Sequence, residues 1–145
     1  MPGYTYAPDR EPDDTEIEAI TRISRGYWQG WYAGDAEHMG RCLHADFELL
    51  GLVHQVLDEG TDFVTTDAET RSSVLQHCAM GTGVADPEER TIEVTVLAAT
   101  HHVASVRAVG HDQTHLLHLM RFPEGWQIVR AIFTQHAGAI PNQSY

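Results

Sequence analysis

Histidine is the residue type through which this chain could best carry out acid-base chemistry. Ten histidines occur among 145 residues, and the ring has an ordinary pKa of ~6.5, which suits proton transfer near neutrality. His118 interrupts an otherwise apolar run, LLHLM. A buried histidine needs hydrogen-bond partners for its ring nitrogens. His118 is therefore our first candidate for a catalytic acid or base.

Tyr27 is the second candidate. It belongs to an apolar stripe with spacings of three and four, which predicts an amphipathic helix carrying Ile17, Ile20, Ile23, Tyr27 and Trp31. A buried tyrosine combines a large apolar ring with one hydroxyl that needs a partner. Taken by itself, the position fits a core tyrosine whose hydroxyl bonds to a neighbour. Trp31, one helical turn further on, fits either core packing or a pocket wall.

The spacing of metal-binding and nucleophilic side chains favours neither kind of chemistry. No H-x-x-x-H or H-E-x-x-H occurs on a predicted helix, and no C-x-x-C occurs at all, although metal sites draw three or four converging ligands. Cys42 and Cys78 lie in apolar helical patterns and are predicted to be buried thiols in a reducing compartment. We therefore expect no metal and no cofactor.

Composition narrows the possible partners. The net charge is −12, the chain contains no lysine, and its arginines are scattered singly. This pattern disfavours nucleic acid and anionic membrane surfaces, and it excludes a lysine Schiff base. No apolar run of ~18 residues and no signal-like N-terminus is present. We expect a cytoplasmic protein whose partner is a small molecule.

The order of the predicted elements indicates a single α+β domain, with helices first and a strand meander afterwards. Residues 1–13 are expected to form a flexible arm, 14–137 the domain and 138–145 a tail. Thr15 and Glu18 form a capping-box signature for the first helix, and Asp35 caps a second. A third helix is predicted to begin at Thr66 or Asp67, while 55–65 stay unassigned. Strands are predicted at 47–54, 91–99, 102–109, 113–122 and 126–136.

Alternation along the last two strands assigns side chains to the pocket. We place Thr114, Leu116, His118 and Met120 on the inner face of the first strand, with His115, Leu117, Leu119 and Arg121 outside. In the last strand, alternation places Val129, Ala131, Phe133 and Gln135 on the same inner face. His54 ends an earlier strand and is either exposed or a base at the pocket mouth. The predicted substrate-binding residues are Trp31, His54, Leu116, Met120, Phe133 and Gln135.

Two stretches carry a resemblance to a known family: GYWQGWYAGDAEHMGRCLHADFELLG and HVASVRAV…LLHLMRFPEGWQIVRAIF. They resemble the SnoaL-like and lumazine-binding branch of the NTF2-like superfamily, over residues 15 to 136. The resemblance implies a cone of three helices packed on a strongly curved, mainly antiparallel sheet around an apolar pocket. It also implies a homodimer formed through the outer face of the sheet.

Ketosteroid isomerase belongs to the same superfamily, and its pocket residues can be carried over by counting from shared motifs. Its hydroxyl donor falls on Tyr27 and its second donor on His118. Its general base falls on Gly51, so steroid isomerisation is not expected.

These observations favour cofactor-independent acid-base chemistry on a small hydrophobic carbonyl or polyene substrate. The expected reaction is an isomerisation, cyclisation or dehydration in secondary metabolism. Tyr27 would donate to a developing oxyanion and His118 would act as general acid or base. Because fold does not decide function, two alternatives stay open: a non-catalytic binding or carrier protein for a small hydrophobic ligand, and a dimerising scaffold.

Overall fold

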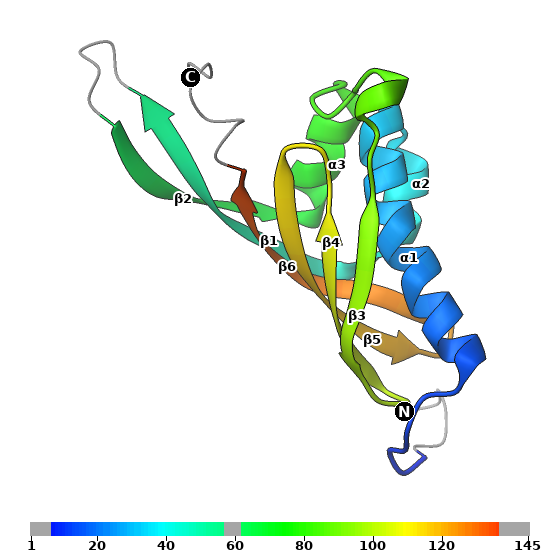
Figure 1. Ribbon diagram of the computed structural model, residues 1–145. Coiled ribbons are helices and arrows are strands. Elements are labelled where there is room, and N and C mark those ends of the chain that lie inside the picture. Colours follow the sequence, from blue (N-terminus) through cyan, green and yellow to red (C-terminus); the bar gives the residue numbers. More distant parts are fainter. Residues whose placement is uncertain (1–6, 57–61, 137–145) are drawn as a thin grey trace.

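The computed structural model describes residues 7–56 and 62–136, and shows three α-helices against one side of a curled six-stranded sheet (Figure 1). The helices are α1 (Asp14–Ala33), α2 (Ala36–Arg41) and α3 (Arg71–Ala79), with a short 3-10 turn at Pro87–Glu89. The strands are β1 (Leu43–Val56), β2 (Asp62–Thr70), β3 (Glu93–Ala99), β4 (Val103–Val109), β5 (Gln113–Phe122) and β6 (Gly125–Gln135). The predicted α+β class is confirmed.

The sheet is mixed, and it does not close. Its strand order is β2-β1-β6-β5-β4-β3, in which β1 and β6 are parallel and every other neighbouring pair is antiparallel. The register shifts between His118 and Leu119 of β5, opposite β6, and between Val96 and Ala98 of β3. Such bulges increase the local twist of a sheet. In Figure 1, β1 and β2 reach well beyond the helices.

Helix α1 begins two residues earlier than its sequence predicted. The Asp13 side chain accepts a hydrogen bond from Glu16 N at 2.8 Å, and Glu16 Oε1 accepts one from Asp13 N at 3.1 Å. Aspartate caps a helix as well as threonine does, so this capping box forms in place of the predicted one at Thr15 and Glu18. The helix ends at Gly34, whose φ of 67° lies in the left-handed region that glycine tolerates.

Residues 62–70 form a strand, so the prediction that α3 begins at Thr66 or Asp67 is wrong. The helix begins at Arg71, and Thr70 caps it by accepting a hydrogen bond from Ser73 N at 3.2 Å. The β-branched run before it favours a strand. Residues 65, 67 and 69 are more buried than their neighbours, which is the alternation of a half-covered strand. Residues 57–61 lie outside the described ones.

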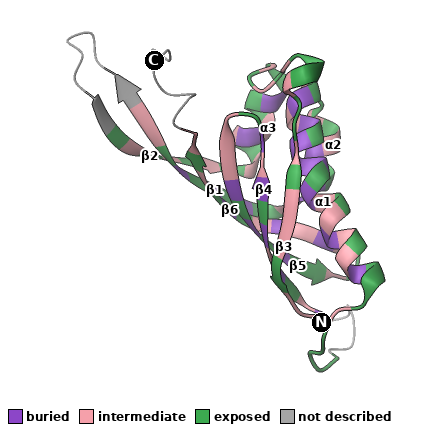
Figure 2. Ribbon diagram, viewed as in Figure 1, coloured by how far each residue is buried: buried purple, intermediate pink, exposed green. Residues whose placement is uncertain are grey.

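The hydrophobic core lies between α1 and the inner face of the sheet. Figure 2 shows buried segments along α1 and on the strands that it covers. Trp28 of the helix and Phe47, Leu117 and Ile128 of the strands are almost fully buried. Burying a side chain of this size contributes roughly 1.5–3 kcal/mol, so these contacts hold the helix against the sheet. Within the described residues, no helix combines the length and apolar character needed to span a membrane.

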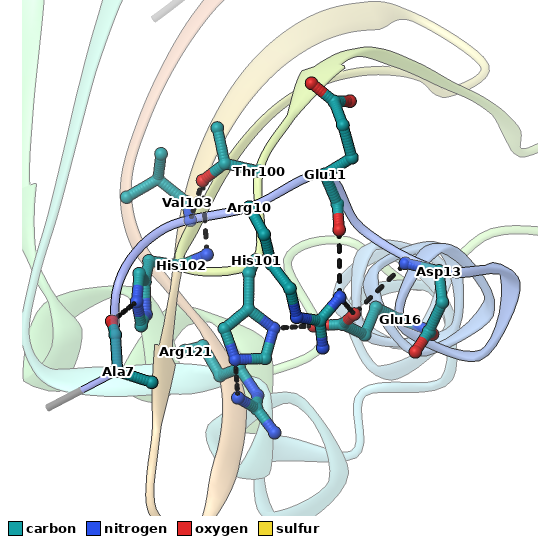
Figure 3. A network of polar contacts seen from close by, with 10 residues as sticks. All are labelled: Ala7, Arg10, Glu11, Asp13, Glu16, Thr100, His101, His102, Val103 and Arg121. Atoms are coloured by element: carbon teal, nitrogen blue, oxygen red, sulfur yellow. Dashed lines mark hydrogen bonds and ion pairs between the residues drawn. The ribbon is translucent and has the colours of Figure 1, made fainter. Parts of the chain in front are cut away.

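A polar cluster ties the N-terminal segment to one end of the sheet (Figure 3). His101 N donates to Arg10 O at 2.8 Å, and Arg10 forms an ion pair of 3.1 Å with Glu16 at the start of α1. Glu16 also accepts a hydrogen bond from His101 Nδ1, and His101 Nε2 accepts one from Arg121 at 2.6 Å. Ala7 O also accepts from His102 Nε2 at 2.6 Å, so the predicted arm is bonded from Ala7 onward. Its residues 1–6 and the predicted tail at 138–145 lie outside the described residues.

Candidate functional site

A cavity of about 550 Å³ lies between the C-terminal half of α1, helix α3 and the inner face of the sheet. Its apolar wall is largely aromatic and includes Trp28, Trp31, Leu49, Val53 and Phe133. Its polar side chains come mainly from β2, α3, β5 and β6, and include Thr65, Asp67, Glu69, His77, Gln113, His115 and Gln135. A cavity of this size and character suits a small organic ligand, with a few polar groups to orient it.

A chain of three hydrogen-bonded side chains reaches this cavity from the core. The Tyr27 hydroxyl of α1 lies 3.0 Å from His115 Nδ1 of β5, and His115 Nε2 lies 2.8 Å from Gln113 Oε1. Tyr27 and His115 are 2% and 4% exposed. Both ring nitrogens thus have a partner, as buried polar atoms require.

The direction of these bonds follows from the chemistry of Gln113. An amide oxygen only accepts, so His115 Nε2 carries the proton and donates it to Gln113 Oε1. The unprotonated Nδ1 then accepts the proton of the Tyr27 hydroxyl. In this arrangement the single hydroxyl proton of Tyr27 is directed to His115.

Burial keeps the hydrogen-bonded side chains of Tyr27 and His115 uncharged. Burial raises the pKa of the Tyr27 hydroxyl far above its ordinary value, and the nearby Glu69 carboxylate raises this pKa further. Burial lowers the pKa of His115 from 6.5 to about 3. Near neutral pH, tyrosine and histidine therefore act as fixed neutral dipoles beside the cavity.

The floor of the cavity is a row of residues that are paired with one another across four neighbouring strands of the inner face. Asp67 of β2 pairs with Gly51 of β1, Gly51 pairs with Phe133 of β6, and Phe133 pairs with His115 of β5. The Phe133 ring stacks on the His115 ring, with centroids 5.0 Å apart and planes at 15°. A Cβ at Gly51 would lie 2.1 Å from Phe133 Cε1, so only glycine leaves room for this ring.

A second polar group lies where β2 meets α3. Glu69 Oε1 accepts a hydrogen bond of 2.9 Å from Ser73 Oγ and forms an ion pair of 3.3 Å with His77 Nε2. These contacts fasten both the first turn of α3, through Ser73, and its last turn, through His77, to the end of β2. Here and in the rest of the described residues, no three side chains of His, Cys, Asp or Glu converge as a metal site would require.

The sequence matches one family model, described as "Putative lumazine-binding", over residues 15–134. The chain belongs to this family. The predicted membership of the NTF2-like superfamily is confirmed by this match and by the fold of similar structures. Among curated proteins, none matches the chain.

Solved structures similar to this family member include NTF2-like proteins of unknown function. One from Silicibacter pomeroyi is 16% identical, with 84% of this chain and 97% of that chain covered and a TM-score of 0.61. A ketosteroid isomerase-like protein from Erwinia carotovora atroseptica is 14% identical, with 86% and 99% covered and a TM-score of 0.60. A protein with a cystatin-like fold from Nostoc punctiforme is 10% identical, with 92% and 99% covered and a TM-score of 0.64. These likenesses establish the shared fold.

The structure reverses the faces predicted for β5. His115, Leu117 and Leu119 are buried, whereas His118 is exposed, and Leu116 and Met120 are 39% and 44% exposed. The prediction that His118, Leu116 and Met120 lie on the inner face is therefore wrong; His118 and Met120 instead line a separate, more open hollow of about 530 Å³ on the outer face, together with Val129. Alternation separates the two faces correctly, but both faces carry one histidine and bulky apolar residues, so the pattern does not say which face is inside.

Other predicted positions divide between the cavity and the rest of the sheet. Trp31, Phe133 and Gln135 line the cavity. Val129 does not, because the bulge opposite His118 breaks the alternation of β6 and leaves Ile128 fully buried instead. His54 follows the cavity-lining Val53 in β1, so alternation turns its side chain away, while its backbone N donates to Gln135 Oε1 at 3.2 Å.

Sequence reasoning missed several polar residues of the cavity, chiefly Gln113, His115, Asp67 and Glu69. Gln113 and His115 lie on the same face of β5 as the buried Leu117 and Leu119, because alternate residues of a strand share a face. The two acids follow the same alternation along β2, which would have revealed them if residues 62–70 had been recognised as a strand.

Proposed function

We propose that this protein is a cofactor-independent acid-base enzyme that acts on a small, planar, hydrophobic molecule bearing a carbonyl group. The reaction class is isomerisation, cyclisation or dehydration, in secondary metabolism within the cytoplasm. The observation that carries the proposal is the buried Tyr27–His115–Gln113 hydrogen-bond chain, which ends at the wall of a cavity lined by aromatic, aliphatic and polar side chains. Tyr27 keeps its predicted role as oxyanion donor, and the histidine beside it is His115, which supports Tyr27 as a neutral hydrogen-bond partner.

Tyr27 becomes a donor to the ligand when the hydrogen bonds from Tyr27 through His115 to Gln113 all reverse their direction. If the Gln113 amide turns over, its NH₂ group donates to His115 Nε2, and the proton of His115 then resides on Nδ1. Nδ1–H donates to the Tyr27 oxygen, and this frees the hydroxyl proton for a ligand. A carbonyl oxygen that gains negative charge during reaction selects this direction, because the reversed chain meets the charge with an aligned row of donors.

The surroundings of the chain make such a donor effective. Oriented dipoles in a site that excludes water stabilise a developing oxyanion strongly, and loss of one donor typically costs about 10²–10³ in rate. Within the described part of the chain, no arginine lines the cavity. His77 lines the cavity but already lies against Glu69, so a carboxylate or phosphate on the ligand would lack a free cationic partner there and a neutral substrate is favoured.

The second function is a binding or carrier protein for a planar hydrophobic ligand, which the family description favours. Binding needs only orienting contacts, whereas catalysis needs proton-transfer groups close to a reacting atom. The two functions therefore differ in turnover.

Hydrogen–deuterium exchange at carbon separates them. β-Tetralone, a fused bicyclic ketone with acidic C–H bonds beside its carbonyl, is incubated with the protein in D₂O and followed by NMR. The enzyme should accelerate exchange, and Tyr27→Phe should reduce the acceleration by ~10² while ligand binding changes less than about tenfold. If β-tetralone binds without accelerated exchange, the binding function replaces the catalytic one.

A homodimer through the outer sheet face completes the proposal. Leu50, Ile132 and Leu116 are paired across three neighbouring strands, and they are 46%, 47% and 39% exposed. The next row carries the Glu48–Arg130 ion pair of 2.9 Å. A second copy related by a two-fold axis can cover the apolar row and place each charge near its opposite. Light scattering should find a dimer that Ile132→Glu converts to a monomer.

A further inference from the structure

We infer that Asp67 is the proton acceptor of this site: it takes a proton from carbon while Tyr27 holds the carbonyl oxygen. The inference rests on the proposed enzymatic function and adds its missing base. Counting from the family resemblance puts the base at Gly51, which has no side chain. Asp67 is the residue directly opposite Gly51 on the neighbouring strand.

The backbone directs Asp67 into the cavity. Residues 65, 67 and 69 alternate with the more exposed 66, 68 and 70, so they share one face of β2. On that face Glu69 bonds with Ser73 and His77 of α3. The same register sets Glu69 opposite Leu49 and Thr65 opposite Val53, both of which line the cavity from β1. Asp67 lies between them and lines the cavity as well.

Asp67 and Tyr27 lie on opposite sides of one aromatic floor. The inner-face row runs from Asp67 through Gly51 and Phe133 to His115, the partner of Tyr27. The Phe133 ring covers the position where a Gly51 side chain would otherwise stand. A flat molecule resting on this ring can direct its carbonyl oxygen to Tyr27 and an acidic C–H bond to Asp67. The substrate class is therefore a planar, conjugated ketone or a related carbonyl compound.

Asp67 is better suited to this role than its neighbour Glu69. Glu69 shares one oxygen between Ser73 and His77, so its charge already has partners. Among the residues that the structure describes, the Asp67 side chain has no hydrogen-bond or ion-pair partner. A carboxylate without a competing donor keeps its lone pairs available to a substrate proton.

The reaction step is balanced without a cofactor. An Asp67 oxygen removes a proton from the saturated carbon next to the carbonyl, and the C–H electron pair forms a double bond from this carbon to the carbonyl carbon. The carbonyl π pair moves onto oxygen, which becomes an enolate oxygen and accepts a hydrogen bond from Tyr27. In a substrate with a second double bond beside the enolate, an oxygen lone pair then re-forms the carbonyl, the double bonds shift along the chain of carbons, and the pair released at the far carbon takes the proton back from Asp67. This completes an isomerisation with no net oxidation or reduction.

Exchange of β-tetralone in D₂O tests this assignment in the intact protein. Asp67→Asn should lower accelerated exchange by ~10² or more, while β-tetralone binding stays within about threefold because the side-chain shape is kept. In Asp67→Gly, added acetate should restore part of the rate, which a purely structural role would not allow. Asp46→Asn, which changes an exposed carboxylate outside the cavity, is the matched control and should exchange at the wild-type rate.

The outcomes separate this inference from the function on which it rests. If the wild type accelerates exchange and Asp67→Asn does so equally, Asp67 is not the base and the enzymatic function survives. Asp67 is likewise excluded as the base if Glu69→Gln abolishes exchange while Asp67→Asn keeps it. If the wild type binds β-tetralone without accelerating exchange, the proposed catalytic function fails and the assignment of Asp67 falls with it.

Discussion

Two buried histidines, His101 and His115, occupy contrasting polar clusters in this molecule. They are 7% and 4% exposed, and each has a partner on both ring nitrogens. The partners of His101 are ions, Glu16 and Arg121, whereas the partners of His115 are the neutral Tyr27 and Gln113. Only His115 lines the cavity. Burial of a histidine therefore does not mark a functional site; the charge of its partners and an adjoining cavity do.

The two clusters respond to acid through different groups. Burial alone would raise the Glu16 pKa, but hydrogen bonds from Asp13 and His101 and the charge of Arg10 outweigh burial and lower it below 4.5. The stability that Glu16 provides is thus present above pH 4.5 and is lost as pH falls below that value. His115 has a folded pKa lowered from 6.5, so the unfolded chain binds its proton first. Its contribution to stability is lost earlier, as pH falls below 6.5.

Removal of Glu16 should have the largest effect on stability and little effect on the cavity. Glu16→Ala removes the half of the capping box in which Asp13 N donates to Glu16, and it leaves His101 Nδ1 without its acceptor. We expect a loss of about 3 kcal/mol in the free energy of unfolding, from roughly 1 for the hydrogen bond from Asp13 N and 2 for the orphaned buried donor. Urea denaturation measures this loss. β-Tetralone exchange by the folded fraction should stay within twofold of wild type, and a tenfold drop would remove the proposed contrast between the clusters.

Gln113→Glu should act in the opposite way, on turnover more than on stability. A carboxylate can only accept, so it fixes the proton on His115 Nε2 and keeps Tyr27 donating to Nδ1. The hydroxyl then cannot turn to the ligand. We expect accelerated β-tetralone exchange to fall by up to ~10², as for loss of an oxyanion donor, with binding nearly unchanged. If this variant exchanged β-tetralone at the wild-type rate, reversal of the Tyr27–His115–Gln113 hydrogen bonds would not be needed for catalysis.

The pH dependence of stability should reveal His115 itself. Between pH 7 and pH 5, protonation of the unfolded chain at an ordinary pKa of 6.5 should cost about 2 kcal/mol, because folded His115 stays neutral. His115→Gln removes this contribution, so its stability should fall less over the same interval. Urea denaturation of both proteins at the two pH values makes the comparison, and equal slopes would contradict the lowered pKa.

His118→Ala should have the smallest effect. His118 is exposed on the outer face of the sheet, outside the cavity. Exposed substitutions of this kind usually change stability by less than about 0.5 kcal/mol, and β-tetralone exchange should stay within twofold. A loss of ~10² would return the catalytic role to His118.

The overall fold is largely predictable because it depends on local patterns. The apolar stripe ending in Tyr27 and Trp31 predicts α1, and the predicted boundaries of β5 are those observed, Gln113–Phe122. Which face of β5 lies inside is not predictable, since His115 and His118 sit on opposite faces of similar composition. That choice depends on packing against α1, which alternation along a single strand does not encode.

The acidic part of the site is hidden for a different reason. Asp67 and Glu69 belong to a strand that directly precedes a helix, and the run TTDAET favours a helix start when only the sequence is considered. As helix residues they would point to different sides, whereas on β2 they share one face. Nor can the sequence show that Asp67 stands opposite Gly51, because this pairing follows from the register of β1 and β2.

A crystal structure with β-tetralone bound tests the central claim most directly. We expect the ketone to lie flat on the Phe133 ring inside the cavity, with its oxygen at hydrogen-bond distance, about 3 Å, from the Tyr27 hydroxyl. The Gln113 side chain should then present its NH₂ group to His115, as its remaining contacts would show. A ketone bound with its oxygen directed away from Tyr27, or bound only on the outer face of the sheet, would contradict the account.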